Sequence, residues 1–332
     1  MLTAWRSTAR LTLLAAGILV ASTAANAQPA SKTESGALNV VTTIRPLHSL
    51  TAAVMDGVGT PRLLVDGSAS PHTFALKPSD AKALAAAKVL LRISPGLEPF
   101  TVKLLQSLPK TVRVVTLQDA PGLTLHKLRT GDTFETHGHD GHKGHGHKEH
   151  GHKSDHGKED LDGHIWLDPD NARIMARFIA ETLATAAPEH AARFRANAEA
   201  LSARLDALAK ELAETVKPAA GKSYIVFHDA YQYFERRYGI APAGSVTISP
   251  DVPASARRIS ALRKKVAELK AACIFAEPQF APRLIDPIIE GTKVRRGVLD
   301  PLGVAIPAGP EQYFALMRAL AGDLRSCLSD PT

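Results

Sequence analysis

Cysteine is almost absent from this sequence: Cys273 and Cys327 are the only two in 332 residues. So small a number excludes a cysteine-rich metal cluster and a scaffold held together by many disulfides. In an oxidising compartment an even pair predicts one disulfide, which would stabilise the fold by about 4 kcal/mol in the chain-entropy model. Two buried free thiols are the alternative.

Aromatic residues are also scarce, at 5% of the chain, and no basic stripe with interleaved aromatics is present. Nucleic-acid binding is therefore not expected. The formal net charge of +7 falls to +5 when Arg6 and Arg10 are removed. We expect this modest surplus of positive charge to be spread along the chain.

Long hydrophobic runs are missing except at residues 11–20, which are too few to span a bilayer. Arg6 and Arg10 precede this run, and the small residues of 25–27 (ANA) follow it, so residues 1–27 are expected to be a cleavable signal peptide. An uncleaved anchor is the alternative. No cysteine lies near the cleavage point for lipid attachment. The secreted chain should start near Gln28, with a disordered N-terminus over residues 28–37.

The rest of the chain alternates between short apolar runs and Ala-rich helical segments. This alternation predicts an α/β fold of two similar lobes, each a parallel sheet flanked by helices. We expect an N-terminal lobe over 38–186, a long rigid connecting helix over 187–217 and a C-terminal lobe over 218–332. Ser79 is expected to cap a helix that begins at Asp80. Strands are expected at 38–44, 62–65, 89–93, 112–117, 223–227, 272–276 and 296–299.

Residues 130–163 interrupt the N-terminal lobe with a His-rich loop that contains almost nothing apolar. Such a segment cannot bury enough surface to fold by itself. Its histidines could collect zinc at several weak auxiliary sites, although no fixed spacing defines a closed site. A tolerated solvated insertion is the alternative. The eight histidines are His137, His139, His142, His145, His147, His150, His152 and His156.

Three other histidines, His72, His164 and His228, lie at or just after the ends of expected strands. Ligands of open α/β sheets bind at the carboxyl ends of strands. Neutral imidazole is a good ligand for Zn²⁺, and three imidazoles with one oxygen ligand complete a tetrahedron. A single histidine at such a place is usually an ordinary hydrogen-bonded residue, so the prediction of a metal site depends on the three as a set.

Six ordered motifs give these histidines a common context. The motifs are 41–50 (VTTIRPLHSL), 70–80 (SPHTFALKPSD), 163–169 (GHIWLDP), 227–234 (FHDAYQYF), 276–280 (AEPQF) and 299–303 (LDPLG). With them the chain resembles the zinc solute-binding proteins of bacterial zinc ABC importers (ZnuA-like), in the metal-binding class with a rigid inter-lobe helix. The resemblance covers nearly all of the mature chain.

The resemblance implies that His72, His164 and His228 are the zinc ligands, in a cleft between the lobes. Manganese-binding relatives carry a carboxylate where this chain has His228, and three imidazoles favour Zn²⁺. Asp300 is a candidate fourth ligand, with water or a loop group as the alternative. Glu277 is expected to orient the site by hydrogen bonding, or else to pair with a basic neighbour. His48 is expected to be structural.

The function implied is capture of Zn²⁺ in the periplasm and its delivery to a membrane permease with a cytoplasmic ATPase, by a monomer without enzymatic activity. Three alternatives remain at this point. The first is a manganese or iron carrier of the same fold, which His228 and the His-rich loop disfavour. The second is a zinc hydrolase, since an open coordination position could activate water, although no His-Glu-x-x-His run is present. The third is an adhesin, for which the sequence offers no separate binding module.

Overall fold

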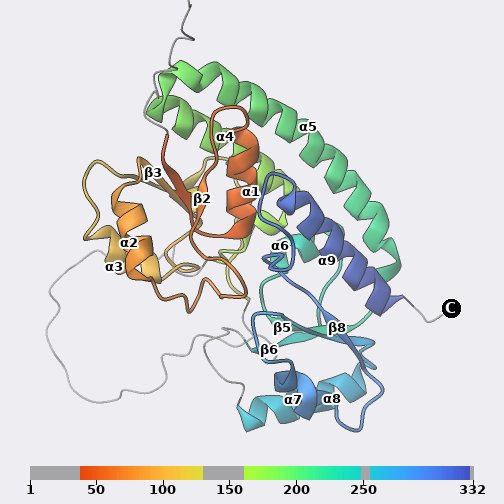
Figure 1. Cartoon of the computed structure of the whole chain (residues 1–332). Helices are drawn as coiled ribbons and strands as arrows, with labels where there is room; N and C mark the ends of the chain where they lie inside the picture. Colours follow the sequence, from red (N-terminus) through yellow and green to blue (C-terminus); the bar gives the residue numbers. More distant parts are fainter. Residues whose placement is uncertain (1–37, 130–160, 248–254, 330–332) are drawn as a thin grey trace, which may run out of the picture. The chain divides into compact units, whose positions relative to one another are not determined.

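The computed structural model describes residues 38–129, 161–247 and 255–329 (Figure 1). The expected signal peptide, the segment 28–37 and the His-rich loop, with all eight of its histidines, lie outside the described residues, apart from the last residues of the loop. Within the described part, no helix has the length and apolar character needed to cross a membrane.

The first lobe is built on a four-stranded parallel sheet in the order β2-β1-β3-β4. Val41 and Leu90 point to one face of this sheet, where they pack with side chains of two short helices, and Val40 and Val89 point to the other face. The strands are β1 (Val40–Thr42), β2 (Arg62–Leu63), β3 (Val89–Arg92) and β4 (Arg113–Thr116), and the helices are α1 (Arg45–Val54), α2 (Pro78–Ala85) and α3 (Phe100–Leu105).

The start of one helix in this lobe differs from the sequence prediction. Helix α2 begins at Pro78, so Ser79 is not its cap, and the Asp80 carboxylate instead accepts a hydrogen bond from the Lys77 backbone N–H at 3.1 Å. Helix α1 begins at Arg45 and takes Pro46 into its first turn. Proline fits a first turn because the N–H it lacks would have no helical partner there.

Two long helices, α4 (Pro169–Ala186) and α5 (Ala191–Val216), pack side by side along both lobes. The connecting helix is shorter than the predicted 187–217 because single 3₁₀ turns, η3 (Pro188–His190) and η4 (Lys217–Ala219), flank it. At 1.5 Å per residue it spans about 39 Å. Its buried stripe follows helical spacing and contains Phe194, Ala198, Leu201, Leu205, Leu208 and Leu212.

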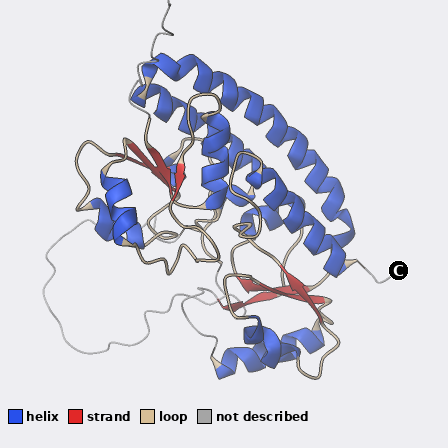
Figure 2. Cartoon of the chain, in the orientation of Figure 1, coloured by secondary structure: helices blue, strands red, loops and turns tan. Residues whose placement is uncertain are grey.

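The second lobe repeats the plan with a parallel sheet in the order β6-β5-β7-β8 (Figure 2). The prediction of two lobes with parallel sheets is therefore confirmed. Its strands are β5 (Tyr224–His228), β6 (Gly244–Thr247), β7 (Cys273–Ala276) and β8 (Arg295–Val298). Its helices are α6 (Gln232–Tyr238), α7 (Ala256–Glu268), α8 (Asp286–Ile289) and α9 (Gln312–Leu328), and the remaining 3₁₀ turns are η1 (Leu117–Asp119), η2 (Ile165–Leu167) and η5 (Pro282–Ile285).

The predicted disulfide is present and joins Cys273 at the start of β7 to Cys327 near the end of α9, with the Cα atoms 6.1 Å apart. It ties the C-terminal helix to the sheet beside Gly297. A Cβ atom at Gly297 would lie 2.5 Å from the Phe275 ring, so only glycine lets β8 approach this core.

Candidate metal centre

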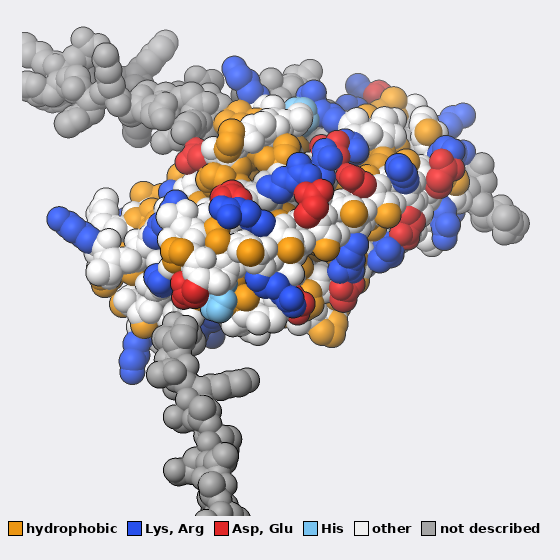
Figure 3. All heavy atoms as spheres, turned by 90° about the horizontal axis from the view of Figure 1, so that it is seen from above, with side chains coloured by type: hydrophobic (Ala, Val, Ile, Leu, Met, Phe, Trp, Pro, Cys, Tyr) orange, Lys and Arg blue, Asp and Glu red, His pale blue; other side chains and the backbone are white. Residues whose placement is uncertain are grey.

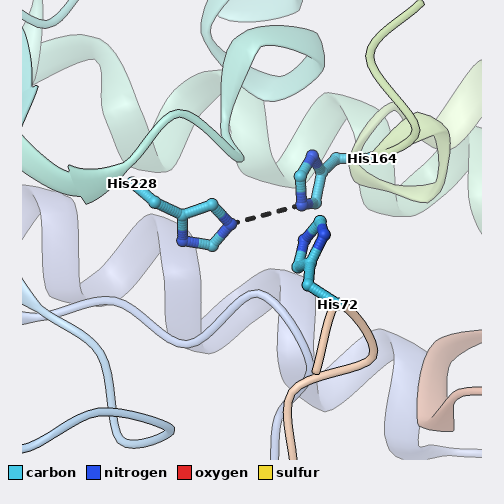
Figure 4. Close-up of side chains that lie close together, drawn as sticks. All are labelled: His72, His164 and His228. Carbon is cyan, nitrogen blue, oxygen red and sulfur yellow. Dashed lines mark hydrogen bonds between the residues drawn. The ribbon is translucent and has the colours of Figure 1, made fainter. Parts of the chain in front are cut away.

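The three histidines predicted as a set converge in the structure (Figure 4). His72 comes from the loop between β2 and α2, His164 precedes η2, and His228 ends β5. Each offers a ring nitrogen, and these ligand atoms all lie within 4.8 Å of one another. The Nε2 atoms of His164 and His228 are 3.3 Å apart. Among the described residues, no other group of three or more His, Cys, Asp or Glu side chains meets this condition.

Asp162 fixes the orientation of His164. Its Oδ1 atom accepts hydrogen bonds from His164 Nδ1 at 2.7 Å and from the His164 backbone N–H at 3.0 Å. A carboxylate partner requires Nδ1 to carry the proton, which leaves the lone pair of Nε2 for a metal. Asp162 is fully buried, and Gln232 donates to its Oδ2 at 3.3 Å while Tyr233 donates to its carbonyl at 2.8 Å.

Glu277 performs the same function for His228, accepting a hydrogen bond from His228 Nδ1 at 2.7 Å. Burial alone would lower the pKa of His228, but the Glu277 carboxylate outweighs burial and raises this pKa above its ordinary value. His72 has no such carboxylate. Burial, reinforced by the two neighbouring imidazoles, holds the His72 pKa well below its ordinary value. The His72 ring is therefore neutral near pH 7, which is the form that binds a metal.

The histidines line a small buried pocket with a free volume of about 10 Å³, about the space of one water molecule or ion. Three polar atoms of its lining, His72 Nε2, Glu277 Oε2 and Gln279 Oε1, are buried without a hydrogen-bond partner in the structure. Buried acceptors normally find a donor or a cation. The pocket is completed by Ser70, Pro71, Trp166, Glu277, Phe280, Pro301 and Leu302.

Both carboxylate oxygens of Asp300, the candidate fourth ligand, accept hydrogen bonds from neighbouring residues. Its Oδ1 accepts hydrogen bonds from Gln279 Nε2 at 2.8 Å and the Leu302 backbone N–H at 3.0 Å, and its Oδ2 accepts one from the Val304 N–H at 2.6 Å. The Asp300 carboxylate is not part of the cluster of ligand atoms. It organises the turn that carries Pro301, whose carbonyl accepts a hydrogen bond from Trp166 Nε1 at 2.9 Å.

His48 and Asp229 are not part of the cluster. His48 is separate from it, buried in α1, with Nε2 3.1 Å from the Pro61 carbonyl oxygen. Asp229, directly after His228, is paired with Arg129, whose Nε donates to Asp229 Oδ2 at 2.9 Å and whose Nη2 donates to Glu235 Oε2 at 2.6 Å. This cation offsets two buried carboxylates next to the site.

Sequence reasoning missed Asp162 and Arg129. Arg129 directly precedes the predicted His-rich loop, and Asp162 lies in its last residues, which were not expected to fold. The one signal for Asp162 was its position two residues before His164, and many short Asp-x-His sequences have no such role. Arg129 carried no signal, because its partners Asp229 and Glu235 are about a hundred residues away along the chain.

The fold has two parallel-sheet lobes joined by long helices, and three imidazoles meet in a small pocket. These features define a metal-binding solute-binding protein. The model of one family matches most of the chain, over residues 40–327, and its description is zinc-uptake complex component A, periplasmic (ZnuA). The chain belongs to this ZnuA family.

Individual proteins with similar sequences bear the name of the same family. The chain is 47% identical over 307 residues to the high-affinity zinc uptake system protein ZnuA of Brucella suis biovar 1 (strain 1330), covering 87% of this chain and 91% of the relative. It is 36% identical over 290 residues to the protein of the same name from Yersinia pestis, covering 87% and 91%.

Solved structures share the fold. A crystal structure of ZnuA superposes with a TM-score of 0.71 at 23% identity, covering 88% of this chain and all of that one. The laminin-binding protein Lmb of Streptococcus agalactiae, described as bifunctional with adhesin and metal-transporting activity, gives a TM-score of 0.70 at 25% identity, covering 88% and 99%.

Proposed function

We propose that this protein captures Zn²⁺ in the periplasm and delivers it to an ABC-type zinc importer. The observation that carries the proposal is the meeting of three imidazoles, with ligand atoms within 4.8 Å, in a pocket of about 10 Å³. The names of the relatives, which are zinc uptake proteins, support it. The partners are then a membrane permease and its cytoplasmic ATPase, and the carrier acts as a monomer.

The ligand set supports zinc over manganese or iron. Within the described residues, the cluster contains three imidazole nitrogens and no carboxylate oxygen. Mn²⁺ prefers hard oxygen donors and a higher coordination number, whereas Zn²⁺ accepts a tetrahedron of nitrogen ligands. Water then completes the site, with Asp300 remaining in its loop; direct ligation by Asp300 would require it to give up the hydrogen bond from Gln279.

The size of the pocket supports a carrier over a hydrolase. A free volume of about 10 Å³ holds one ion or water and leaves no room for an ester or a peptide beside the metal. Asp162 and Glu277 each hold an imidazole Nδ1 atom through one carboxylate oxygen, which is how carboxylates orient ligating histidines. Zinc is therefore the cargo of this site.

Competitive loading tests this proposal. Demetallated protein is offered equal amounts of Zn²⁺, Mn²⁺ and Fe²⁺, and the bound metals are counted by mass spectrometry. We expect one tightly bound zinc and almost no manganese. His228→Asp should shift the preference toward Mn²⁺ because it introduces a hard oxygen ligand. Preferential loading of manganese by the unmodified protein, or ester turnover that His228→Ala abolishes, would contradict the proposal.

A further inference from the structure

The net positive charge of the chain is concentrated in one segment. The expectation that this charge is spread along the chain is therefore wrong. Residues 256–296 contain ten Lys and Arg against four Asp and Glu, a surplus of six, while the surplus of the whole chain is seven. The remainder of the protein is therefore close to neutral. The segment comprises α7, β7, η5, α8 and the start of β8.

The acidic residues of this segment offset little of that charge. Glu277 is buried against His228, Glu268 pairs with Lys264 at 3.7 Å, and Asp286 pairs with Arg296. Glu290 is the fourth. Exposed cations remain along α7 and across the turns that follow it, and we call them the basic surface: Arg257, Arg263, Lys264, Lys270, Arg283 and Lys293.

Charges elsewhere are arranged differently. On the face that carries α5, basic and acidic side chains are interspersed (Figure 3). There Arg195 pairs with Glu181 at 2.7 Å, and further pairs are Arg177–Glu199, Arg204–Glu311 and Arg318–Glu211. On the basic surface, by contrast, Arg257, Lys270, Arg283 and Lys293 have no acidic partner among the residues that the structure describes. Unpaired like charges on one face are costly without an anionic partner.

The basic surface also contains exposed aliphatic groups. Five large apolar side chains are exposed in the described chain, and three of them belong to or border this segment: Leu269 at 46%, Leu284 at 44% and Val298 at 50%. Leu269 directly precedes Lys270 at the end of α7. Aliphatic side chains beside lysines and arginines are typical of surfaces that lie on an anionic membrane, where lysine stems follow the apolar boundary and their ammonium groups reach the phosphates.

Between the end of α7 and the turn before β8 lies a groove of about 740 Å³. Lys270, Lys293 and Arg295 form its charged lining, Val266 and Val294 contribute apolar walls, and no acidic residue lines it. It lies at the amino ends of β7 and β8, whereas His228 lies at the carboxyl end of β5, so the groove is separate from the metal centre. Its charged lining suits an anionic phosphate, and the groove has ample room for a headgroup.

We propose that the basic surface binds the anionic phospholipids of a membrane, with a headgroup phosphate between Lys270 and Lys293. The cations extend along the 13 residues of α7, about 20 Å, and a bilayer presents negative charge continuously over such a distance. Each basic residue near an anionic membrane adds to its attraction. Under the proposed function, this attraction concentrates the carrier at the membrane that holds its importer, but the binding itself does not depend on zinc.

Vesicle flotation tests the proposal. The zinc-free and zinc-loaded protein is mixed with vesicles of phosphatidylglycerol and phosphatidylethanolamine in equal amounts, or of phosphatidylcholine alone. We expect binding to the anionic vesicles only, weakened by salt. Lys270→Glu with Lys293→Glu should weaken binding by roughly a hundredfold. Lys270→Arg with Lys293→Arg should bind like the unmodified protein, and so should the matched control, Lys103→Glu with Lys110→Glu on the other lobe.

Three results would overturn the proposal: equal binding to both kinds of vesicle, no binding to either, or an undiminished affinity of the Lys270→Glu/Lys293→Glu variant. Loss of binding to detergent-solubilised importer in that variant, without any vesicle binding by the unmodified protein, would assign the surface to an acidic protein partner instead. One zinc per chain in every variant shows that the fold and the metal centre are intact, so the two proposals fail separately.

Discussion

Asp162 accepts hydrogen bonds from both the ring Nδ1 and the backbone N–H of His164, at 2.7 and 3.0 Å. Asp162 therefore fixes the tautomer of the His164 imidazole and also holds the His164 backbone in place. Because Tyr233 of α6 donates to the Asp162 carbonyl, the orientation of His164 is set by contacts with the second lobe. The metal centre thus depends on carboxylates that do not touch the metal.

Replacing Asp162 tests this dependence. We expect Asp162→Ala to weaken zinc binding by roughly 10–100-fold, since loss of the carboxylate behind a ligating histidine frees its tautomer and its ring orientation. Competition against a zinc chelator measures the change. Asp206→Ala, an exposed aspartate on α5, is the matched control and should bind zinc normally. An Asp162→Ala protein with unchanged affinity would show that the hydrogen bond has no role in binding.

Asp300→Asn distinguishes a ligand from a loop-organising residue. An asparagine keeps one acceptor oxygen, so the turn should lose the hydrogen bond from Val304 and about 1–2 kcal/mol of stability. We expect zinc affinity to fall by less than about tenfold, far less than for His164→Ala. Urea denaturation and chelator competition measure the two effects. A loss of affinity as large as that of His164→Ala would establish Asp300 as the fourth ligand.

Arg129 should be important for stability because its removal leaves Asp229 and Glu235 buried without their cation. We expect Arg129→Ala to lower the free energy of unfolding by about 3–5 kcal/mol, measured by urea denaturation of the zinc-free protein. Arg195→Ala breaks an exposed pair with Glu181 and should cause almost no change. Similar effects of the two substitutions would argue against a buried ionic network.

Glu98 should make the stability of the zinc-free protein depend on pH. Burial raises its pKa from 4.5 to about 7, against the hydrogen bonds from Thr43, Ser94 and Ile93 that favour the ionised form. Between these values the folded state binds more protons than the unfolded state. The free energy of unfolding should therefore fall as pH rises from about 4.5 through about 7.

Glu98→Gln cannot ionise and removes this contribution. Relative to the variant, the unmodified protein should lose up to about 3 kcal/mol between pH of about 4.5 and about 7.5, as measured by urea denaturation across that range with a chelator present. Parallel pH profiles of the two proteins would show that Glu98 titrates normally in the folded state.

The sequence predicted those parts of the protein that local pattern determines. Short apolar runs located most strands, and His72 follows β2 of the first sheet while His228 ends β5 of the second. Strand β6 (Gly244–Thr247) was not predicted because four residues with one large apolar side chain, Val246, carry no strand pattern. The error at Ser79 has a similar cause, since Pro78 is equally suited to start a helix.

The supporting shell of the site could not be predicted, because it depends on tertiary contacts. Asp162 is important only because the chain returns at α6 to place Gln232 and Tyr233 against it. Asp300 looks like a metal ligand in sequence, but the turn it forms satisfies both of its oxygens. The ligands follow from residue type and position, whereas their orientation follows from the folded structure.

X-ray absorption spectroscopy of the protein loaded with one equivalent of zinc tests the central claim most directly. The account predicts three imidazole nitrogens at about 2.0 Å with one oxygen ligand, and the loss of one imidazole in His228→Ala. A shell dominated by oxygen, or a His228→Ala spectrum that is unchanged because zinc binds elsewhere on the chain, would contradict it.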